Sequence, residues 1–513
     1  MQLSRLLRDI DGARITGDPA LSIRGLAYDS RSVEPGFLFA ALEGSKRDGL
    51  EYVERAVAAG AVAIAASRPP SKAGGAAWVQ VPDDRLALAL MARNYYGRPD
   101  ERLTMVGVTG TNGKTTTTWL LEAALAEAGM RPCLLGTVSY RFGREEKKAE
   151  RTTPESLDLM AALDRFATAG ARSCVMEVSS HALALRRVDG VRFAAAVFTN
   201  LTRDHLDFHG DMEAYFQAKR RLFEMLPAGA PSAINIDDRR GASLAGAGGR
   251  PITYGVNQPA DVSPGALSFS LAGLAFEART PRGTVRVRSP LVGRPNVYNI
   301  LAAIAAATGL GLPIEAIERG ISALEGVPGR FQVVSTPHAD FTVVVDYAHT
   351  DDALRNLLET ARPLTEGRLI TVFGAGGDRD RTKRPLMGAV AGRSSDLIVI
   401  TSDNPRSEDP NRIIDEIKRG ITPDTQRGGQ RVLTIADRRT AVIKAIELAR
   451  PGDVVLIAGK GHEKYQVIGD QTIPFDDVAV AREALNRRGS RSGEGGDGEG
   501  GDGSPYAVRR PVP

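Results

Sequence analysis

A glycine-rich segment between a predicted strand and a predicted helix has the residue types and spacing to bind phosphate. It reads Gly110-Thr111-Asn112-Gly113-Lys114-Thr115-Thr116, after the apolar run 104–108 and before residues with helical spacing. Glycines let backbone N–H groups face phosphate oxygens, the lysine adds positive charge, and a threonine hydroxyl can reach magnesium. Five residues separate Gly107 from Gly113, one more than in the common motif. The sequence therefore predicts a variant ATP-binding loop.

Polar side chains that follow two other predicted strands could assist this loop. Glu177 comes at the end of an apolar stretch that begins at Ser173, where a carboxylate could hold magnesium against the phosphates. His205 and His209 follow the apolar run 194–198, and the chain has only six histidines. An ordinary strand-end carboxylate and structural histidines are the competing interpretations.

A second series of apolar runs predicts another parallel sheet. The runs are 341–345, 369–373, 397–401 and 454–458, and each leads into a polar segment. These polar segments are Asp346-Tyr347-Ala348-His349, residues 374–379, Ser402-Asp403-Asn404-Pro405-Arg406 and Gly459-Lys460-Gly461-His462-Glu463. Because ligands of open parallel sheets collect beyond the carboxyl ends of the strands, one composite binding site is expected there.

The length of 513 residues exceeds a single hydrophobic core and, at about 150 residues per domain, predicts three α/β domains. The expected boundaries are residues 1–100, 101–329 and 330–488, since the chain is rich in Gly and Pro near 325–330. Residues 489–513 are Gly-rich and acidic, which is typical of a disordered tail.

Composition narrows the class of protein. Two cysteines are too few for a disulfide framework, and the first ten residues lack the uninterrupted apolar stretch of a secretory signal, so a cytoplasmic location is expected. The apolar segment 300–312 is too short to cross a bilayer of about 30 Å. The net charge is +4, the lysines and arginines are scattered along the chain, and aromatic residues make up 5%. Neither a membrane nor a nucleic acid is therefore expected as a partner.

From about Tyr28 to Asp477, the chain resembles the Mur ligases. The resemblance rests on ten separate motifs, which jointly are highly specific. They are Asp29-Ser30-Arg31, residues 110–115, Glu177-Val178-Ser179-Ser180-His181, residues 200–205, Asn296-Val297-Tyr298-Asn299, residues 346–350, residues 376–380, residues 383–387, residues 403–406 and residues 459–463.

The resemblance implies a three-domain α/β fold: an N-terminal domain for the uridine nucleotide, a central P-loop ATPase domain and a C-terminal Rossmann-like domain for an amino acid. It also implies an ATP-dependent ligase of peptidoglycan precursor synthesis that acts as a monomer with Mg²⁺. The D-Glu carboxylate of UDP-MurNAc-L-Ala-D-Glu would be activated as an acyl phosphate, and the amine of the amino acid would displace phosphate. Magnesium and Lys114 would offset the repulsion between carboxylate and ATP.

Site residues follow from the resemblance, position by position. The catalytic residues would be Lys114, Glu177, His205 and Lys219. The magnesium ligands would be Thr115, Glu177, His205 and Lys219. ATP would also contact residues 110–116, Asn296, Asn299, Asp346 and His349. The UDP-muramoyl dipeptide would contact Ser30, Ser45, Lys46, Arg47, Thr152, Thr153, Ser179 and Arg187.

Lys219 matches a lysine that the family carbamylates, although the sequence alone favours an exposed helix lysine. Leu185 stands where the family usually has glutamine, which puts one substrate hydrogen bond in doubt.

The amino acid is expected to be meso-diaminopimelate, because Arg406 can receive its second carboxylate in bidentate geometry. The resemblance places Arg379, Asp403, Asn404, Pro405, Arg406, Gly459 and Glu463 around it. Lysine or ornithine is the alternative, and Asn404-Pro405 also favours a simple turn. Two other functions are less well supported by the motifs: that of a folylpolyglutamate synthetase, and that of a scaffold that binds nucleotide without catalysis.

Overall fold

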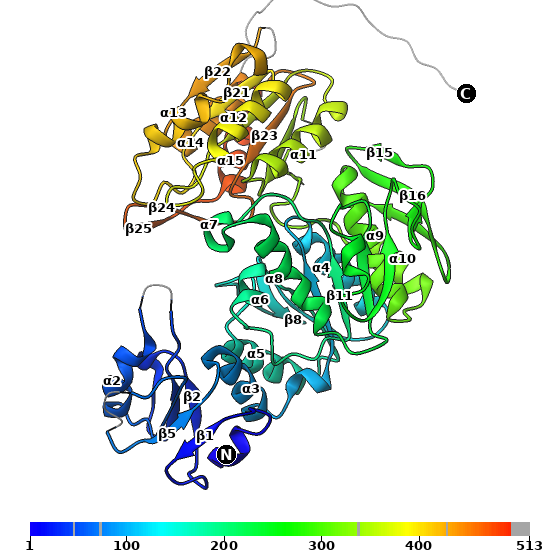
Figure 1. Cartoon of the computed structure of the whole chain (residues 1–513). Coiled ribbons are helices and arrows are strands. Elements are labelled where there is room, and N and C mark those ends of the chain that lie inside the picture. Colours follow the sequence, from blue (N-terminus) through cyan, green and yellow to red (C-terminus); the bar gives the residue numbers. More distant parts are fainter. Residues whose placement is uncertain (45–46, 71–73, 336–338, 427–428, 494–513) are drawn as a thin grey trace, which may run out of the picture. The chain divides into compact units, whose positions relative to one another are not determined.

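The structure is a computed structural model, and it describes all residues except 45–46, 71–73, 336–338, 427–428 and 494–513. The chain forms two compact units (Figure 1). The first contains Met1–Phe331 with Arg355–Thr360, and the second contains Gln332–Leu354 with Ala361–Pro513. The predicted domains 1–100 and 101–329 therefore share one unit, and the three predicted boundaries stay predictions.

The first hundred residues build a five-stranded sheet in the order β1-β5-β4-β3-β2, in which only β1 is antiparallel to its neighbour. Its strands are β1 (Arg14–Thr16), β2 (Gly25–Ala27), β3 (Phe37–Ala40), β4 (Ala63–Ala66) and β5 (Ala77–Gln80), and its helices are α1 (Leu3–Leu6), α2 (Val53–Ala58) and α3 (Asp84–Tyr95). The side chain of Asp83 caps α3 by accepting from the N–H groups of Arg85 and Leu86. This is the α/β arrangement expected of the N-terminal region.

An eight-stranded sheet follows, in the order β13-β12-β11-β6-β10-β7-β8-β9, and its first six strands are parallel. The strands are β6 (Thr104–Thr109), β7 (Pro132–Leu135), β8 (Ser139–Phe142), β9 (Glu145–Lys148), β10 (Ser173–Glu177), β11 (Ala195–Phe198), β12 (Pro231–Asn235) and β13 (Arg250–Tyr254). The helices are α4 (Lys114–Glu127), α5 (Ser156–Thr168), α6 (Ser180–Ala184), α7 (Leu206–His209), α8 (Met212–Glu224), α9 (Arg294–Gly309) and α10 (Ile314–Ala323).

Alternating residues of the parallel strands supply two separate cores. In β6, Met105 lies in one core with side chains of α5 and α8, while Val106 and Val108 lie in the other with side chains of α4, α9 and α10. Because successive strand residues point to opposite faces, a sheet covered on both faces needs continuous apolar strands. This need explains the unbroken apolar runs, and it leaves the carboxyl ends of the strands as the polar edge.

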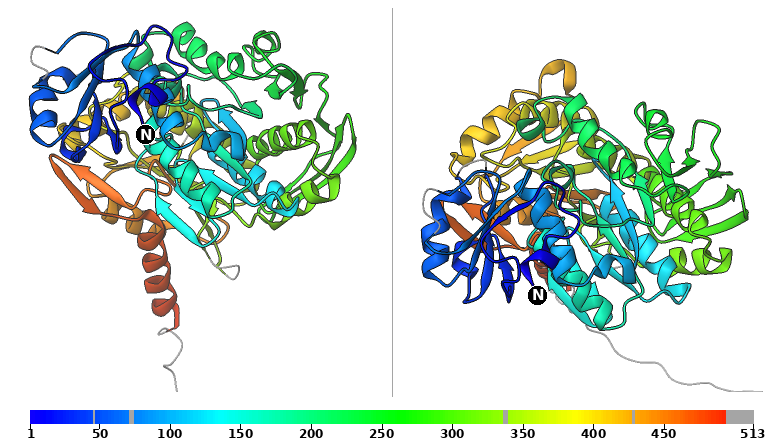
Figure 2. Two further views of the ribbon diagram at one scale, coloured as in Figure 1. Left: turned by 90° about the horizontal axis from the view of Figure 1, so that it is seen from below. Right: turned by 60° about the horizontal axis from the view of Figure 1, so that its bottom comes forward.

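A small antiparallel sheet adds to the second of these cores. It consists of β14 (Ser263–Pro264), β15 (Ser268–Ser270), β16 (Gly273–Thr280) and β17 (Gly283–Ser289). Leu274 and Phe276 of β16 and Val285 and Val287 of β17 share the apolar cluster of α9 and α10. Figure 2 shows this sheet, in green, beside those helices.

The second unit is built on a six-stranded sheet in the order β18-β19-β23-β20-β21-β22, and all its pairs except β18–β19 are parallel. The strands are β18 (Gln332–Val333), β19 (Thr342–Asp346), β20 (Leu369–Phe373), β21 (Leu397–Ile400), β22 (Arg431–Thr434) and β23 (Val454–Ala458), with a hairpin of β24 (Tyr465–Ile468) and β25 (Gln471–Pro474). The helices are α11 (Asp351–Ala361), α12 (Lys383–Ser394), α13 (Pro410–Lys418), α14 (Arg438–Leu448) and α15 (Asp477–Gly493).

Helices α14 and α15 share an apolar core with one face of the six-stranded sheet. The predicted strands 369–373 and 454–458 coincide with β20 and β23, and the predicted strand 341–345 is displaced by one residue from β19. Helix α15 continues to Gly493, five residues into the predicted tail, and the rest of that tail lies outside the described residues.

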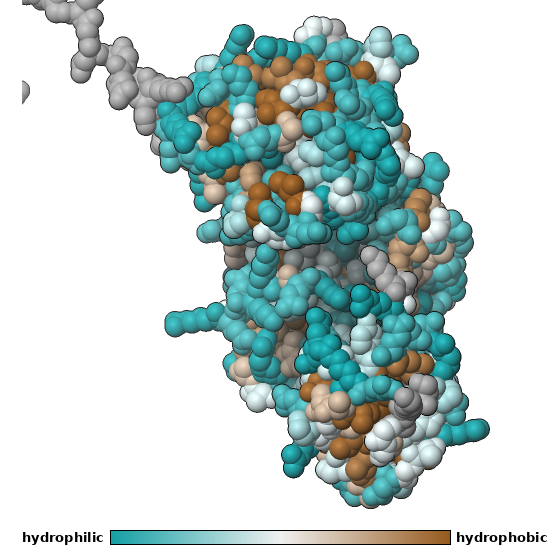
Figure 3. Space-filling model, turned by 90° about the vertical axis from the view of Figure 1, so that its left-hand side faces the viewer, coloured by the Kyte–Doolittle hydropathy of each residue, from teal (hydrophilic) through white to brown (hydrophobic). Residues whose placement is uncertain are grey.

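Hydrophilic side chains cover most of the face in Figure 3, and apolar ones gather in a few small areas. In the part of the chain that the structure describes, eight large hydrophobic side chains are exposed. None of the helices described is both long and apolar enough to cross a bilayer.

Gly320 of α10 lies against the backbone of α4, and this close approach gives a test of the packing. A Cβ added at Gly320 would lie 2.5 Å from Ala124 Cα. Since backbone cannot rotate away, we expect Gly320→Ala to separate the helices and to lower the free energy of unfolding by about 1–3 kcal/mol, despite alanine's better helix propensity. Urea unfolding followed by circular dichroism would measure this.

Gly326→Ala is the control for that substitution, because a Cβ there has no neighbour within 4 Å. It should leave the unfolding midpoint within error of the wild type. An equal midpoint for the Gly320 variant would show that the helices do not meet as described.

Candidate functional site: a phosphate loop and a second cluster of strand-end residues

The predicted phosphate loop connects β6 to α4, and two of its glycines have left-handed backbone angles. Gly110 has φ +147° and Gly113 has φ +86°. A Cβ at Gly110 would lie 1.8 Å from Thr199 Oγ1, and one at Gly113 would lie 2.3 Å from Asn299 Oδ1. Both the backbone angles and the close neighbours therefore require glycine.

Lys114 folds back over this loop. Its Nζ donates to the carbonyl oxygens of Gly110 and Thr111, at 2.9 Å each. Burial lowers the pKa of Lys114, Glu177 and Asp204 oppose this effect, and Arg330 adds to it. The amine is thus held where a phosphate bound to the loop would lie.

Hydrogen bonds from the segment after β11 fix the shape of the loop. The N–H of Asn112 donates to Asn200 Oδ1 at 2.9 Å, and the hydroxyl of Thr199 donates to the Asn112 carbonyl at 2.6 Å. On α9, Asn299 Nδ2 donates to Asn296 Oδ1 at 2.9 Å. Asn299 touches the loop through the close approach to Gly113, so the structure brings both predicted asparagines to it.

Glu177 lies at the end of β10, beside β6, and is 1% exposed. Its carboxylate accepts from the N–H of Thr137 at 2.8 Å and from the Thr137 hydroxyl at 2.9 Å. The same hydroxyl lies 3.1 Å from Thr152 Oγ1. Thr153 donates to the Glu177 carbonyl at 2.8 Å and accepts from the Ser179 N–H at 3.0 Å. Three of the residues predicted to bind the dipeptide thus adjoin the predicted magnesium ligand.

A cluster of aromatic rings surrounds His205. The ring of His181 lies 4.7 Å from that of His205 and 5.5 Å from that of His209, measured between centroids. Burial lowers the pKa of His205 to about 3, with further lowering by nearby cations, against the attraction of Asp204 at 3.5 Å. Burial likewise lowers the pKa of His209 to about 4. Near neutral pH both rings are therefore uncharged and able to accept or donate hydrogen bonds.

Lys219 is buried, so the interpretation from sequence alone as an exposed helix lysine is wrong. It is 1% exposed, and its Nζ lies 4.2 Å from the ring centroid of Tyr215. Helix α8 turns this residue toward the sheet, which the local pattern did not reveal because lysine is rarely buried without a partner. Burial, and next the charge of Lys114, hold the pKa of Lys219 well below its usual range.

The oxygen donors of this region suit magnesium that takes most of its ligands from phosphate and water. Such a site needs only one or two protein carboxylates. Glu177 supplies a carboxylate, and Thr115 supplies a hydroxyl that accepts from Arg330 at 3.1 Å. Across the described residues, no group of three or more His, Cys, Asp or Glu side chains could form an all-protein metal site.

Arg187, predicted to bind the dipeptide, pairs with Glu155 at 2.9 Å and donates to the Thr153 carbonyl at 3.2 Å. Leu185, which replaces the family's glutamine, is partly buried at the end of α6. The other predicted nucleotide-binding residues belong to the N-terminal sheet region. Ser30 is buried there and Arg47 donates to Tyr52 at 2.8 Å, whereas Ser45 and Lys46 lie outside the described residues.

In the second unit, a buried lysine joins three side chains that follow β21 and β23. Lys460 Nζ donates to Asn404 Oδ1 at 2.9 Å and pairs with Glu463 at 3.2 Å and with Asp403 at 3.7 Å. Burial raises the pKa of Asp403, but Lys460 and then Arg438 lower it, and the net shift is downward. A Cβ at Gly459 would lie 2.5 Å from Asp403 Oδ2. Four of the residues predicted to bind the amino acid are therefore together.

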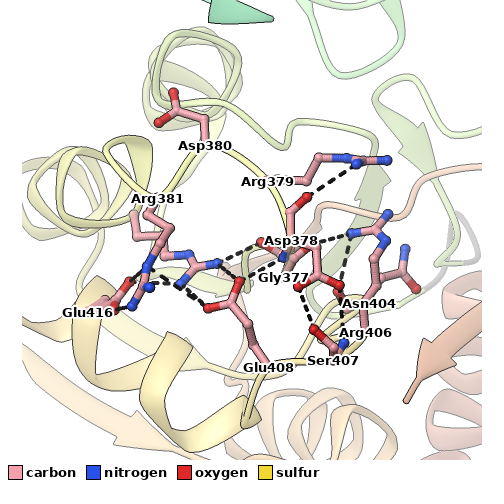
Figure 4. Close-up of polar contacts among 12 residues, drawn as sticks. Gly377, Asp378, Arg379, Asp380, Arg381, Asn404, Arg406, Ser407, Glu408 and Glu416 are labelled. Carbon is pink, nitrogen blue, oxygen red and sulfur yellow. Dashed lines mark hydrogen bonds and ion pairs between the residues drawn. The ribbon is translucent and has the colours of Figure 1, made fainter. Parts of the chain in front are cut away.

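Arg406 and Arg379 lie on neighbouring loops of the same unit. Arg406 has a left-handed φ of +52°, and its NH1 donates to the Gly377 carbonyl at 2.7 Å. Pro405 precedes it, and a Cβ at Gly377 would lie 1.9 Å from the Pro405 carbonyl oxygen. Figure 4 shows the two guanidinium groups on the same side of these loops. They could together receive a carboxylate.

The remaining predicted ATP residues also belong to the second unit. Asp346 ends β19 and accepts from the N–H of Ala348 at 2.8 Å, and His349 Nδ1 lies 2.9 Å from the Tyr347 carbonyl oxygen. The predicted ATP set is thus divided between the two units.

Two residues that the sequence analysis did not single out belong to these clusters. Asp204 acts on the pKa values of Lys114, His205 and Lys219, and Lys460 joins three predicted site residues. Both stand inside motifs that were recognised, but only contacts made after folding reveal that they are central to the clusters.

Three family models match the chain. They are described as the Mur ligase family catalytic domain, over residues 22–96, the Mur ligase middle domain, over residues 108–307, and the Mur ligase glutamate ligase domain, over residues 329–461. Between them they cover the residues of the clusters described above except Glu463, which lies two residues beyond the third model.

One similar protein is the UDP-N-acetylmuramoyl-L-alanyl-D-glutamate–2,6-diaminopimelate ligase of Solibacter usitatus, which is 51% identical over 472 residues, 91% of this chain and 94% of that protein. A solved structure of a ligase with the same name is 35% identical, with a TM-score of 0.67, and the match covers 95% of this chain and 100% of that one. The MurF ligase of Thermotoga maritima, solved with ADP, is 20% identical with a TM-score of 0.62, over 94% and 100% of the chains, and shares the fold.

Gly113→Ala tests the phosphate loop. Alanine is strained at φ +86°, and its Cβ would displace Asn299. Because displacing Asn299 would shift the loop N–H groups away from the phosphate oxygens, we expect ATP to bind about tenfold more weakly, about 1.4 kcal/mol. Titration with a fluorescent ATP analogue would measure the Kd.

Gly129→Ala at the far end of α4 is the matched control. Its φ is +74°, but no atom lies within 4 Å of the added Cβ. It should lose similar stability and keep the Kd of the wild type. If both variants bound nucleotide equally well, the loop would not be the ATP site.

Proposed function

We propose that this chain, which belongs to the Mur ligase family, is an ATP-dependent ligase that adds meso-diaminopimelate to the D-Glu carboxylate of UDP-MurNAc-L-Ala-D-Glu. The product would be a UDP-muramoyl tripeptide for peptidoglycan synthesis, with ADP and phosphate. The observation that carries the proposal is the phosphate loop with its partly buried Lys114, beside Glu177 and the threonines expected to bind the dipeptide.

The reaction has two steps. An oxygen of the D-Glu carboxylate attacks the γ-phosphorus of ATP, and the bond to ADP breaks. The amine of diaminopimelate then attacks the carbonyl carbon of the acyl phosphate, which expels phosphate as the amine loses a proton. The first step brings anions together, so positive charge must lie near the phosphates.

The side chains around the loop are suited to the first step. Loop N–H groups and Lys114 Nζ would hold the phosphates, while Glu177 and the Thr115 hydroxyl would hold Mg²⁺. Bound Mg²⁺ would neutralise charge on the phosphates and on the incoming carboxylate. His205, uncharged near neutral pH, would complete the ligands or orient them.

We also propose that Lys219 reacts with CO₂ to form N6-carboxylysine. Carbamylation requires the neutral amine, and the lowered pKa of Lys219 favours that form. The carbamate forms as the amine nitrogen bonds to the carbon of CO₂ and releases a proton. The modified side chain would carry a negative charge and relieve the repulsion from Lys114.

Diaminopimelate would bind in the second unit. Arg406 and Arg379 would receive its second carboxylate, and the acidic groups of Glu463 and Asp403 suit an ammonium group. Asp346 and His349 would contact ATP. A cytoplasmic location, a monomeric state and the exclusion of nucleic-acid and membrane partners stay predictions.

The choice of amino acid can be tested with purified protein, ATP, Mg²⁺ and the UDP-muramoyl dipeptide. We expect phosphate release with meso-diaminopimelate at a kcat/KM about 100-fold or more above that with lysine or ornithine, because a desolvated carboxylate–arginine contact contributes about 2–5 kcal/mol. Arg406→Ala should remove most of this preference. Arg412→Ala, at an exposed position of α13, is the control. Equal turnover of lysine by the wild type would refute the proposed substrate.

Carbamylation of Lys219 can be tested by NMR with ¹³C-bicarbonate. We expect a carbamate carbon signal in the wild type and none in Lys219→Gln, which should also lose most activity. Lys148→Gln, at an exposed position of β9, should keep both the signal and the activity. A fully active wild type without the signal would contradict the modification.

A further inference from the structure

Two loops that follow adjacent strands of the second unit are joined directly. The first, here called the arginine loop, contains residues 376–381, and the second, here called the specificity loop, contains residues 402–408. The N–H of Gly377 donates to the Asn404 carbonyl at 2.9 Å. The Asp378 carboxylate accepts from the Ser407 hydroxyl at 2.7 Å and from the Ser407 N–H at 3.2 Å (Figure 4).

An ion pair between the buried Arg384 and the partly exposed Glu408 holds both loops to α12. Arg384 is 0% exposed, and it donates to the two oxygens of Glu408 from NH1 at 2.9 Å and from NH2 at 2.8 Å. Its NH2 also donates to the Gly376 carbonyl at 3.1 Å, and its NH1 donates to Glu416 at 2.8 Å. Glu408 in turn accepts from the Asp378 N–H at 2.7 Å. One arginine and one carboxylate thus tie the arginine loop to the specificity loop.

The position of Arg406 depends on this connection. Its guanidinium is anchored by NH1 on the Gly377 carbonyl, and a Cβ at Gly376 would lie 3.0 Å from that NH1. Arg379 belongs to the same arginine loop, and its NH1 donates to the Asp378 carbonyl at 3.2 Å. A shift of one loop against the other would therefore change the spacing of the two guanidinium groups. In Figure 4, Arg381, Glu408 and Glu416 gather on the opposite side from these two groups.

We propose that Arg384, Glu408 and Asp378 are positioning residues that set the preference for an amino acid with a second carboxylate. They act by fixing the spacing of Arg379 and Arg406, and they do not touch the substrate. Recognition of a carboxylate by guanidinium groups requires placement to within about 0.5 Å, which side chains on unsupported loops do not maintain. The inference rests on the proposed function, because it concerns the same amino-acid site.

Glu408→Gln is the principal test, since glutamine keeps the shape of the side chain and removes its charge. We expect the KM for diaminopimelate to rise about tenfold, with kcat and the KM values for ATP and the UDP-dipeptide within twofold of the wild type. The weak reaction with lysine should change less, because lysine lacks the second carboxylate. The ratio of kcat/KM for diaminopimelate to that for lysine should therefore fall by about tenfold, about 1.4 kcal/mol.

Asp453→Asn provides a matched control within the same unit. Asp453 is also paired with an arginine, since its Oδ2 accepts from NH2 and Nε of Arg368 at 2.6 and 3.2 Å, and it also accepts backbone N–H groups, from Arg368 at 2.7 Å and Arg450 at 2.8 Å. It precedes β23, so it lies at the amino end of a strand whose carboxyl end carries the site. Removing the charge of Asp453 should lower the melting temperature and leave the ratio of kcat/KM for diaminopimelate to that for lysine unchanged.

The outcomes separate the hypotheses. A fall in the ratio for Glu408→Gln alone supports the proposal, and equal ratios in both variants overturn it. If Glu408→Gln does not fold, Asp378→Ala removes the second connection, the hydrogen bonds from Ser407, and should lower the same ratio. A wild type that prefers lysine would refute the proposed function itself, whereas a correct wild type with an unchanged variant ratio would refute only the positioning role.

Acid unfolding gives a second readout of the ion pair. The hydrogen bonds from Arg384 lower the pKa of Glu408 to about 2. Because a depressed carboxyl pKa stabilises the fold above the unfolded pKa, near 4.5, this stabilisation should be lost as the pH falls from about 4.5 toward 2. The difference in melting temperature between wild type and Glu408→Gln should therefore shrink over that range. A constant difference would show that Glu408 is not held as an anion by Arg384.

Discussion

Two lysine side chains, Lys219 buried and Lys114 partly buried, lie close to the phosphate loop, and the repulsion between their charges is the constraint on which the first unit depends. Burial and then the charge of Lys114 lower the pKa of Lys219, and burial together with the charge of Arg330 lowers the pKa of Lys114. Desolvated cations are costly unless anions offset them. Glu177 and Asp204 offset part of the cost, and a site of this kind favours polyanionic ligands or a modification that adds negative charge.

The scaffold of the first unit makes this arrangement possible. Continuous apolar strands bury both faces of the sheet, so polar side chains have room only at the strand ends. There the loop is held from several directions, by Thr199 and Asn200 after β11 and by Asn299 of α9. A rigid scaffold thus holds the loop in one conformation, although the loop itself consists of glycines, whose backbone is conformationally free, and of polar residues.

In the second unit, the buried cationic side chains are paired with carboxylates. Lys460 is shared by Asp403, Asn404 and Glu463, and Arg438 forms a fully buried bidentate pair with Asp477. Paired charges of both signs suit an amino acid, which carries ammonium and carboxylate groups together. The two lysines of the first unit are only partly offset by anions, whereas the buried cations of the second unit are paired. This difference agrees with phosphates binding to the first unit and the amino acid binding to the second.

The sequence by itself determined the parallel α/β sheets, the glycine-rich loop between β6 and α4 and the family, because these depend on short apolar runs and on motifs within a few residues of each other. The strands at 369–373 and 454–458 were predicted to the residue. Tertiary structure alone decided the burial of Lys219, the three-way contact of Lys460 and the ion pair of Arg384 with Glu408. Each of these joins residues on different elements or turns a side chain into the core, and periodicity does not encode which distant groups a buried charge will meet.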